Sequence, residues 1–98
     1  MAKTTAPRRL SPESKKLWAK VIEDYGIEDA AFLRVLEVGL LALDRAESCR
    51  KRIETDGLMV ADRFKQKKSH PLLPVERDSR AQWFQAVKTL GLDPEGLE

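Results

Sequence analysis

The fold of this chain is decided by residues 28–57, which read EDAAFLRVLEVGLLALDRAESCRKRIETDG. Acidic residues open the stretch and basic residues crowd its last turns, an order that suits the dipole of an α-helix. Gly57 can adopt the left-handed conformation that ends such a helix. We therefore predict one long helix of about 28 residues, roughly 42 Å in length. Because a compact domain of this size has a radius of gyration of about 13 Å, the helix is expected to project beyond its own core.

The apolar residues of this helix form two adjacent stripes, which together occupy more than half of its circumference as far as Leu43. A helix that packs on a single partner usually shows a narrower stripe. We therefore predict that it contacts its own chain on one side and another subunit on the other. The alternative is complete burial within a monomeric helical bundle. One stripe consists of Phe32, Leu36, Leu40 and Leu43, and the other of Ala31, Val35, Val38, Ala42 and Cys49.

The composition is that of one helical, well-solvated domain. Charged residues make up 35% of the 98 residues and aromatic residues 6%, which suits helices better than a β-sandwich or a disordered tail. The longest apolar run, residues 38–43, is far shorter than the roughly 18 residues of a membrane span, and no apolar block follows the basic residues near Met1. We expect a soluble, cytoplasmic protein with no membrane partner. Cys49 is the only cysteine, which excludes an intrachain disulfide and a thiolate metal cluster.

The helix signals divide the chain into three segments. Residues 1–10 are basic with almost nothing to bury, and we expect a flexible arm. Residues 11–94 are predicted to form a single helical domain, and residues 95–98 a tail. A first helix begins at Ser11-Pro12 and ends at Gly26. Its apolar face carries Leu17, Trp18, Val21, Ile22 and Tyr25.

The remainder of the chain predicts a short extended or hairpin segment and a third helix, which makes the fold class mainly α. Residues 58–69 alternate weakly between apolar and polar side chains, which allows a short strand or hairpin. The third helix is expected to begin at His70-Pro71 and to end at Gly91. Its expected buried residues are Leu72, Leu73, Ala81, Phe84, Val87 and Leu90, with Trp83 near the edge.

Charge is distributed unevenly along the chain, although the net charge is only +2. Residues 1–20 carry a net +5 and residues 50–68 a net +4, whereas residues 21–49 carry −5 and residues 69–98 carry −2. Two basic segments therefore flank an acidic, apolar middle. This pattern is compatible with nucleic-acid contacts at two separate places, and equally with a merely solvated surface.

Sequence motifs for catalysis are missing. The chain has no glycine-rich phosphate loop, no paired histidine ligands and no serine nucleophile elbow. His70 is the only histidine and has no evident partner for general-base chemistry. We therefore predict a protein that is not an enzyme and that has no metal or cofactor.

The chain carries a series of short landmarks in a definite order. These are Leu10-Ser11-Pro12-Glu13 leading to Trp18, a long helix ending in Asp56-Gly57-Leu58, then His70-Pro71-Leu72-Leu73 and a closing Leu90-Gly91-Leu92-Asp93-Pro94. This order, which covers Leu10 to Pro94, resembles that of the small subunit of tailed-phage terminases. Such proteins tend to continue with a small residue and an arginine, whereas this chain continues with Glu95-Gly96-Leu97-Glu98.

This resemblance implies a DNA-packaging factor in the host cytoplasm. Such a factor is a non-catalytic, ring-forming homo-oligomer that binds double-stranded viral DNA and regulates the terminase large subunit, the ATPase and nuclease. The expected fold is then a helical hairpin with one long central helix, a short extended or hairpin segment and a third helix, in a ring-like oligomer. The alternatives are a dimeric helical transcriptional regulator with a palindromic site and a helical adaptor that does not bind DNA.

Candidate residues follow for both kinds of contact. The oligomer interface is predicted at Phe32, Val35, Leu36, Leu40 and Leu43. The first DNA-binding candidates are Lys3, Arg8, Arg9, Lys15, Lys16 and Lys20, and the second group is Lys65, Lys67 and Lys68.

Overall fold

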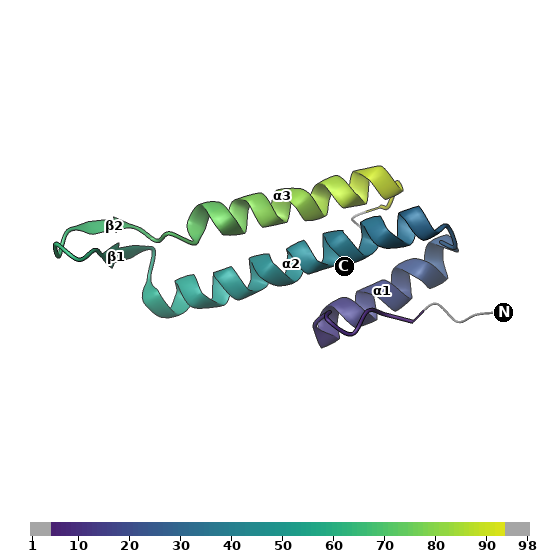
Figure 1. Ribbon diagram of the computed structural model, residues 1–98, viewed down its shortest axis with the longest axis horizontal. Helices are drawn as coiled ribbons and strands as arrows, with labels where there is room; N and C mark the ends of the chain where they lie inside the picture. The colour runs from purple at the N-terminus through teal and green to yellow at the C-terminus, as the bar shows by residue number, and fades with distance from the viewer. Residues whose placement is uncertain (1–4, 94–98) are drawn as a thin grey trace.

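The computed structural model describes residues 5–93 and confirms the predicted mainly α fold. Its elements are α1 (Pro12–Tyr25), α2 (Ala30–Asp56), β1 (Met59–Ala61), β2 (Lys67–Ser69) and α3 (Leu73–Leu90). α2 and α3 lie antiparallel along most of the molecule, and α1 lies beside the N-terminal half of α2 (Figure 1). The β1–β2 hairpin extends from the opposite end. The molecule measures 59 × 24 × 22 Å, and its radius of gyration of 16.3 Å exceeds the roughly 13 Å of a compact domain of this length.

Local capping interactions set the ends of the first two helices. Ser11 precedes α1 and accepts a hydrogen bond from the backbone N–H of Ser14 at 3.1 Å. Asp29 caps α2 by accepting from the N–H groups of Ala31 and Phe32. For this reason α2 begins after the Glu28-Asp29 pair and contains 27 residues, about 40 Å of helix.

The hairpin is antiparallel and pairs Met59 with Ser69. His70 connects it to the helices. The backbone N–H of Leu72 donates to His70 Nδ1 at 3.1 Å, so Nε2 is the protonated ring nitrogen and donates to Asp56 Oδ2 at 2.9 Å. α3 therefore starts at Leu73, a little later than predicted, because His70 and the following turn join the hairpin to α2.

One apolar core lies where all three helices meet. Leu36 and Leu40 of α2 are completely buried there. The helix predicted to have two covered sides is thus flanked by α1 and α3 of its own chain (Figure 1). The segment before α1 also contributes to the core, because Leu10 is only 4% exposed. The buried core comprises Leu10, Trp18, Val21, Ile27, Leu36, Leu40, Trp83, Val87 and Leu92.

The buried face of α3 differs from the predicted one. Trp83, which was expected near the edge, is 7% exposed, whereas Phe84 is 54% exposed and Ala81 is also exposed. The physical reason is that the buried face includes two polar side chains, Glu76 and Ser79, which a search for apolar periodicity passes over. With those residues included, the spacing centres the buried face on Trp83.

An ion-pair network joins α2 and α3 towards the hairpin. The carboxylate of Glu76 accepts hydrogen bonds from the guanidinium groups of Arg50 and Arg80, and Arg80 also pairs with Glu47 at 3.1 Å. The hydrogen bond from Arg50 is the main cause that lowers the pKa of Glu76 from its ordinary value; burial opposes this shift, and Arg80 adds to it. These polar contacts therefore add to the burial of Ala46, Cys49 and Ile53 of α2 in the part of the α2–α3 pair that lies towards the hairpin.

Candidate nucleic-acid interface

The basic surface of α1 consists of three lysines that are all exposed, Lys15, Lys16 and Lys20. Lys20 forms an ion pair with Asp24 at 3.2 Å, one helical turn away. Within residues 5–93, Lys15 and Lys16 form no ion pair, so their ammonium groups are free to approach an anion. These two lysines are the strongest phosphate-contact candidates on α1.

The basic residues before α1 are held differently. Arg8 is exposed, whereas Arg9 pairs with Glu37 of α2 at 3.1 Å, beside a second pair between Arg34 and Glu37 at 3.0 Å. The hydrogen bond from Arg9 is the main cause that lowers the pKa of the Glu37 carboxyl; burial opposes it, and Arg34 reinforces it. Arg9 thus ties the segment before α1 to the long helix. Lys3 lies outside the described residues.

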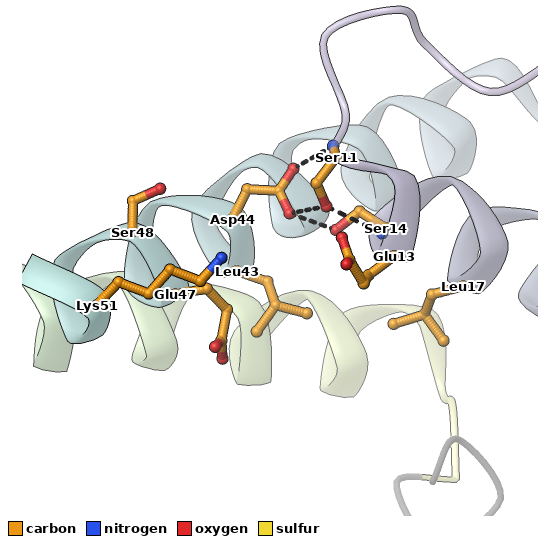
Figure 2. A pocket seen from close by; sticks show the side chains of 9 residues that line it. All are labelled: Ser11, Glu13, Ser14, Leu17, Leu43, Asp44, Glu47, Ser48 and Lys51. Carbon is orange, nitrogen blue, oxygen red and sulfur yellow. Dashed lines mark hydrogen bonds between the residues drawn. The ribbon is translucent and has the colours of Figure 1, made fainter.

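Asp44 of α2 fixes the start of α1. Its carboxylate accepts hydrogen bonds from the backbone N–H of Ser11 at 2.9 Å, from the Ser11 hydroxyl at 2.7 Å and from the Ser14 hydroxyl at 2.6 Å (Figure 2). Three hydrogen bonds to this one carboxylate therefore attach the start of α1 to the middle of α2. Because Lys15 and Lys16 follow Ser14 directly, these bonds set the position of the α1 lysines relative to the long helix.

A surface pocket of about 400 Å³ adjoins these hydrogen bonds. The serines next to Asp44 in this pocket serve to join α1 to α2. The hydroxyls of Ser11 and Ser14 donate to Asp44, and the only histidine of the chain, His70, is bonded to Asp56 beside the hairpin. The arrangement therefore gives none of the three serines that line the pocket an imidazole base. The pocket is lined by Ser11, Glu13, Ser14, Leu17, Leu43, Asp44, Glu47, Ser48 and Lys51 (Figure 2).

The second basic group lies on the hairpin. Lys65, Lys67 and Lys68 are all exposed, and only Lys68 has an ionic partner in the described part of the chain, Asp62 at 3.5 Å. Sequence reasoning missed the two residues at the tip. Arg63 and Phe64 are both exposed, and the Arg63 guanidinium lies 5.0 Å from the centre of the Phe64 ring. An aromatic residue between two cations, Arg63 and Lys65, in the segment that could form a hairpin was the signal that could have identified them.

The two groups of DNA-binding candidates are not brought together in one subunit. The α1 lysines lie on the part of the molecule where α1 covers α2, and the hairpin lysines lie at the far end of the α2–α3 pair (Figure 1). A DNA duplex contacting both groups on one subunit would have to follow the length of the molecule.

The predicted oligomer contacts divide into two groups. Leu36 and Leu40 are 0% exposed within a single subunit, so they have no surface with which to contact another subunit. The prediction that these two residues lie in the oligomer interface is therefore corrected: they belong to the core of the subunit. Phe32 is 48% exposed, and Val35 and Leu43 are partly exposed.

A shallow apolar groove near these residues was not predicted. It lies between α2 and α3, and Val38, which is 49% exposed, forms part of its wall. Its lining consists of Arg34, Val35, Val38, Gly39, Gln82, Gln85, Ala86 and Thr89.

Comparison with known protein families decides the family. Residues 14–96 match the family described as phage terminase, small subunit, and this match covers most of the 98 residues. The chain belongs to this family. Comparison with curated proteins and with solved structures found no match. The resemblance inferred from the order of landmarks is thereby confirmed. Membership of this generally non-catalytic family associates the chain with phage DNA packaging.

No helix within residues 5–93 is long and apolar enough to span a membrane. The same residues contain no cluster of three or more histidine, cysteine or acidic side chains that could hold a metal ion.

Proposed function

We propose that this protein is the small subunit of a phage DNA-packaging terminase, which binds viral double-stranded DNA and regulates the large subunit in the host cytoplasm. The family match over residues 14–96 is the observation that carries this proposal. The large subunit supplies the ATPase and nuclease, and the small subunit contributes DNA binding and assembly rather than catalysis.

Phosphate contacts dominate DNA binding in this proposal. Lys15 and Lys16 support it, because they are exposed, lack ionic partners within residues 5–93 and follow the turn that Asp44 anchors. Lysine ammonium groups contact phosphates as point charges and carry little information about base sequence. Affinity should therefore fall steeply with salt and vary little between duplexes of different sequence.

Self-assembly is the second part of the proposal, and exposed apolar side chains on two flanks of the subunit support it. One flank carries the groove with Val35 and Val38. On α3 the groove residues are Gln82, Gln85, Ala86 and Thr89, and Phe84 lies about 150° around the helix axis from their centre.

Apolar patches that face in different directions suit a head-to-tail contact between copies. A two-fold dimer uses the same patch on both subunits, whereas a head-to-tail contact closes into a ring when the rotation permits. We therefore propose a homo-oligomeric ring in which the flank containing Val38 contacts the opposite flank of the next copy.

Two measurements on the purified protein test this function. Light scattering on a sizing column, at low and high salt, should give the mass of a closed species of many subunits. Fluorescence anisotropy with duplexes of unrelated sequence should give similar affinities and a linear fall of log affinity with log salt concentration.

Other outcomes identify the alternatives. A dimer that prefers one palindromic duplex at high salt would indicate a transcriptional regulator. An intact oligomer that fails to bind DNA even at low salt would indicate an adaptor. Either result would overturn the proposal.

A further inference from the structure

The tip of the β1–β2 hairpin is a preformed turn. Asp62 Oδ1 accepts from the backbone N–H of Phe64 at 2.8 Å and from that of Gln66 at 3.0 Å. The N–H of Asp62 donates to the carbonyl of Gln66, and the N–H of Lys65 donates to the carbonyl of Asp62, both at 2.9 Å. Lys65 completes the turn in the left-handed conformation, with φ of 63°. The backbone is thus closed on itself, so the tip presents its side chains in a defined arrangement.

Phe64 at this tip is 69% exposed, the highest value for any large apolar side chain among residues 5–93. Its only ring contact there is with the Arg63 guanidinium, 5.0 Å from the ring centre. The turn therefore holds an aromatic ring in solvent, where burying it against a partner would be favourable.

Basic residues predominate in the segment that carries this ring. Residues 62–69 contain Arg63, Lys65, Lys67 and Lys68 against one acidic residue, Asp62. The carboxylate of Asp62 is already engaged, because Oδ1 accepts the two backbone hydrogen bonds and Oδ2 pairs with Lys68 at 3.5 Å. The charge of the tip thus complements a polyanion.

We propose that the hairpin tip binds the minor groove of double-stranded DNA, with the Phe64 ring inserted as a wedge at a base-pair step. Arg63 and Lys65 contact the phosphates on either side. The chemical basis is that minor-groove proteins combine cationic side chains with an apolar wedge, which partly unstacks a step and kinks the duplex. The inference rests on the proposed function, since it assigns a mode of binding to the DNA that the protein is proposed to package.

This contact is separate from the α1 lysines, because the hairpin lies at the other end of the molecule (Figure 1). The two contacts also differ in kind. The α1 lysines act by charge alone, whereas the wedge deforms the duplex and should favour easily unstacked pyrimidine–purine steps. A modest preference for flexible steps would therefore accompany the largely sequence-independent phosphate binding.

The test compares Phe64→Ala with Leu58→Ala in the full chain. Both variants remove an exposed apolar side chain of the hairpin region, but Leu58, which is 59% exposed, lies directly before β1 and away from the tip. A duplex carrying a fluorophore pair at its ends reports bending, and 2-aminopurine at a central step reports unstacking. The wild type and Leu58→Ala should bend the duplex and raise the 2-aminopurine emission. Phe64→Ala should lose both signals and bind about tenfold or more weakly.

Arg63→Gln provides a second variant at the tip that keeps the ring. It should weaken binding and lower the salt dependence while leaving the unstacking signal of the bound complex in place. Bending and unstacking by Phe64→Ala equal to those of the wild type would overturn the wedge while leaving DNA binding intact. Loss of binding to the terminase large subunit, with DNA bending unchanged, would assign the tip to a protein contact instead. Failure of the wild type to bind any duplex would instead contradict the proposed function.

Discussion

Gly39 of α2 and Ala86 of α3 mark a closest approach between the two long helices: a Cβ atom added at Gly39 would lie 2.6 Å from the Cβ of Ala86. The same added atom would lie 3.2 Å from Cε3 of Trp83. Gly39→Ala should therefore lower stability even though alanine favours helix by about 1 kcal/mol, because overpacking of a close contact costs roughly 1–3 kcal/mol. Thermal unfolding should show a Tm several degrees below that of the wild type.

Ala86→Gly supplies the matching control for this contact. In the double variant the new Cβ at position 39 faces a position from which a Cβ has been removed. The two substitutions together should be less destabilising than their separate effects added, with residual strain from Trp83. Simple additivity in the double-mutant cycle would contradict the proposed steric cause.

Asp44→Asn should loosen α1 from the long helix. The carboxylate accepts from Ser11 and Ser14, whereas an amide presents one acceptor oxygen and one donor nitrogen to the same donors. The free energy of unfolding, measured by urea unfolding, should fall by about 1–3 kcal/mol. Amide hydrogen exchange should become faster than in the wild type, and the increase should be larger in α1 than in α3. Ser48 is an exposed residue of the same pocket, and its hydroxyl makes no hydrogen bond within residues 5–93, so Ser48→Ala should change neither quantity.

The sequence predicted the elements better than their contacts. The long helix and its end at Gly57 followed from charge order, apolar stripes and a terminal glycine, which are local signals. The hairpin stayed ambiguous because its turn is closed by Asp62 over several residues rather than by a two-residue turn motif. The buried face of α3 was misjudged because it includes Glu76, whose buried carboxylate is paired with Arg50, a residue 26 positions away.

The candidate site shows the same division. Exposed lysines could be selected from charge clustering alone, and Lys15, Lys16, Lys65 and Lys67 are exposed in the fold. No pattern in the sequence indicates that Asp44 holds the first turn of α1, because side-chain hydrogen bonds between residues 30 or more positions apart leave no periodic signal. Burial of Leu36 and Leu40 within one subunit likewise depended on where α1 and α3 pack.

Acid should weaken the α2–α3 pair through Glu76. Its folded-state pKa is lowered, chiefly by the Arg50 hydrogen bond, so its contribution to stability is complete above the ordinary pKa of 4.5 and is lost as pH falls through the lower folded value. Glu76→Gln should cost about 1–3 kcal/mol near neutral pH and much less in acid. Urea unfolding from pH 7 to pH 3 measures the free energy of unfolding of the wild type and of Glu76→Gln. Parallel stability curves for the two would exclude this ion pair as a source of acid sensitivity.

Replacing both unpaired lysines of α1 should weaken DNA binding in a way that depends on salt. Lys15→Ala combined with Lys16→Ala removes two proposed phosphate contacts, so the slope of log affinity against log salt concentration should fall by about 0.9 for each contact. The loss should be similar for duplexes of different sequence. Lys88→Ala, at an exposed lysine of α3 outside the candidate groups, is the control. An unchanged slope in the double variant would remove α1 from the DNA interface.

Val38→Glu should reduce the mass of the assembled protein without unfolding the subunit. Val38 is 49% exposed in the wall of the groove, so a carboxylate there is solvated in the free subunit but would be buried opposite an apolar surface in the assembly. Light scattering should therefore show monomers or small oligomers, while the circular dichroism spectrum stays helical. Leu58→Glu is the control, because Leu58 is 59% exposed but lies beside β1, away from the groove. If both variants keep the wild-type mass, the groove is not the contact between copies, and the exposed face around Phe32 becomes the next surface to test.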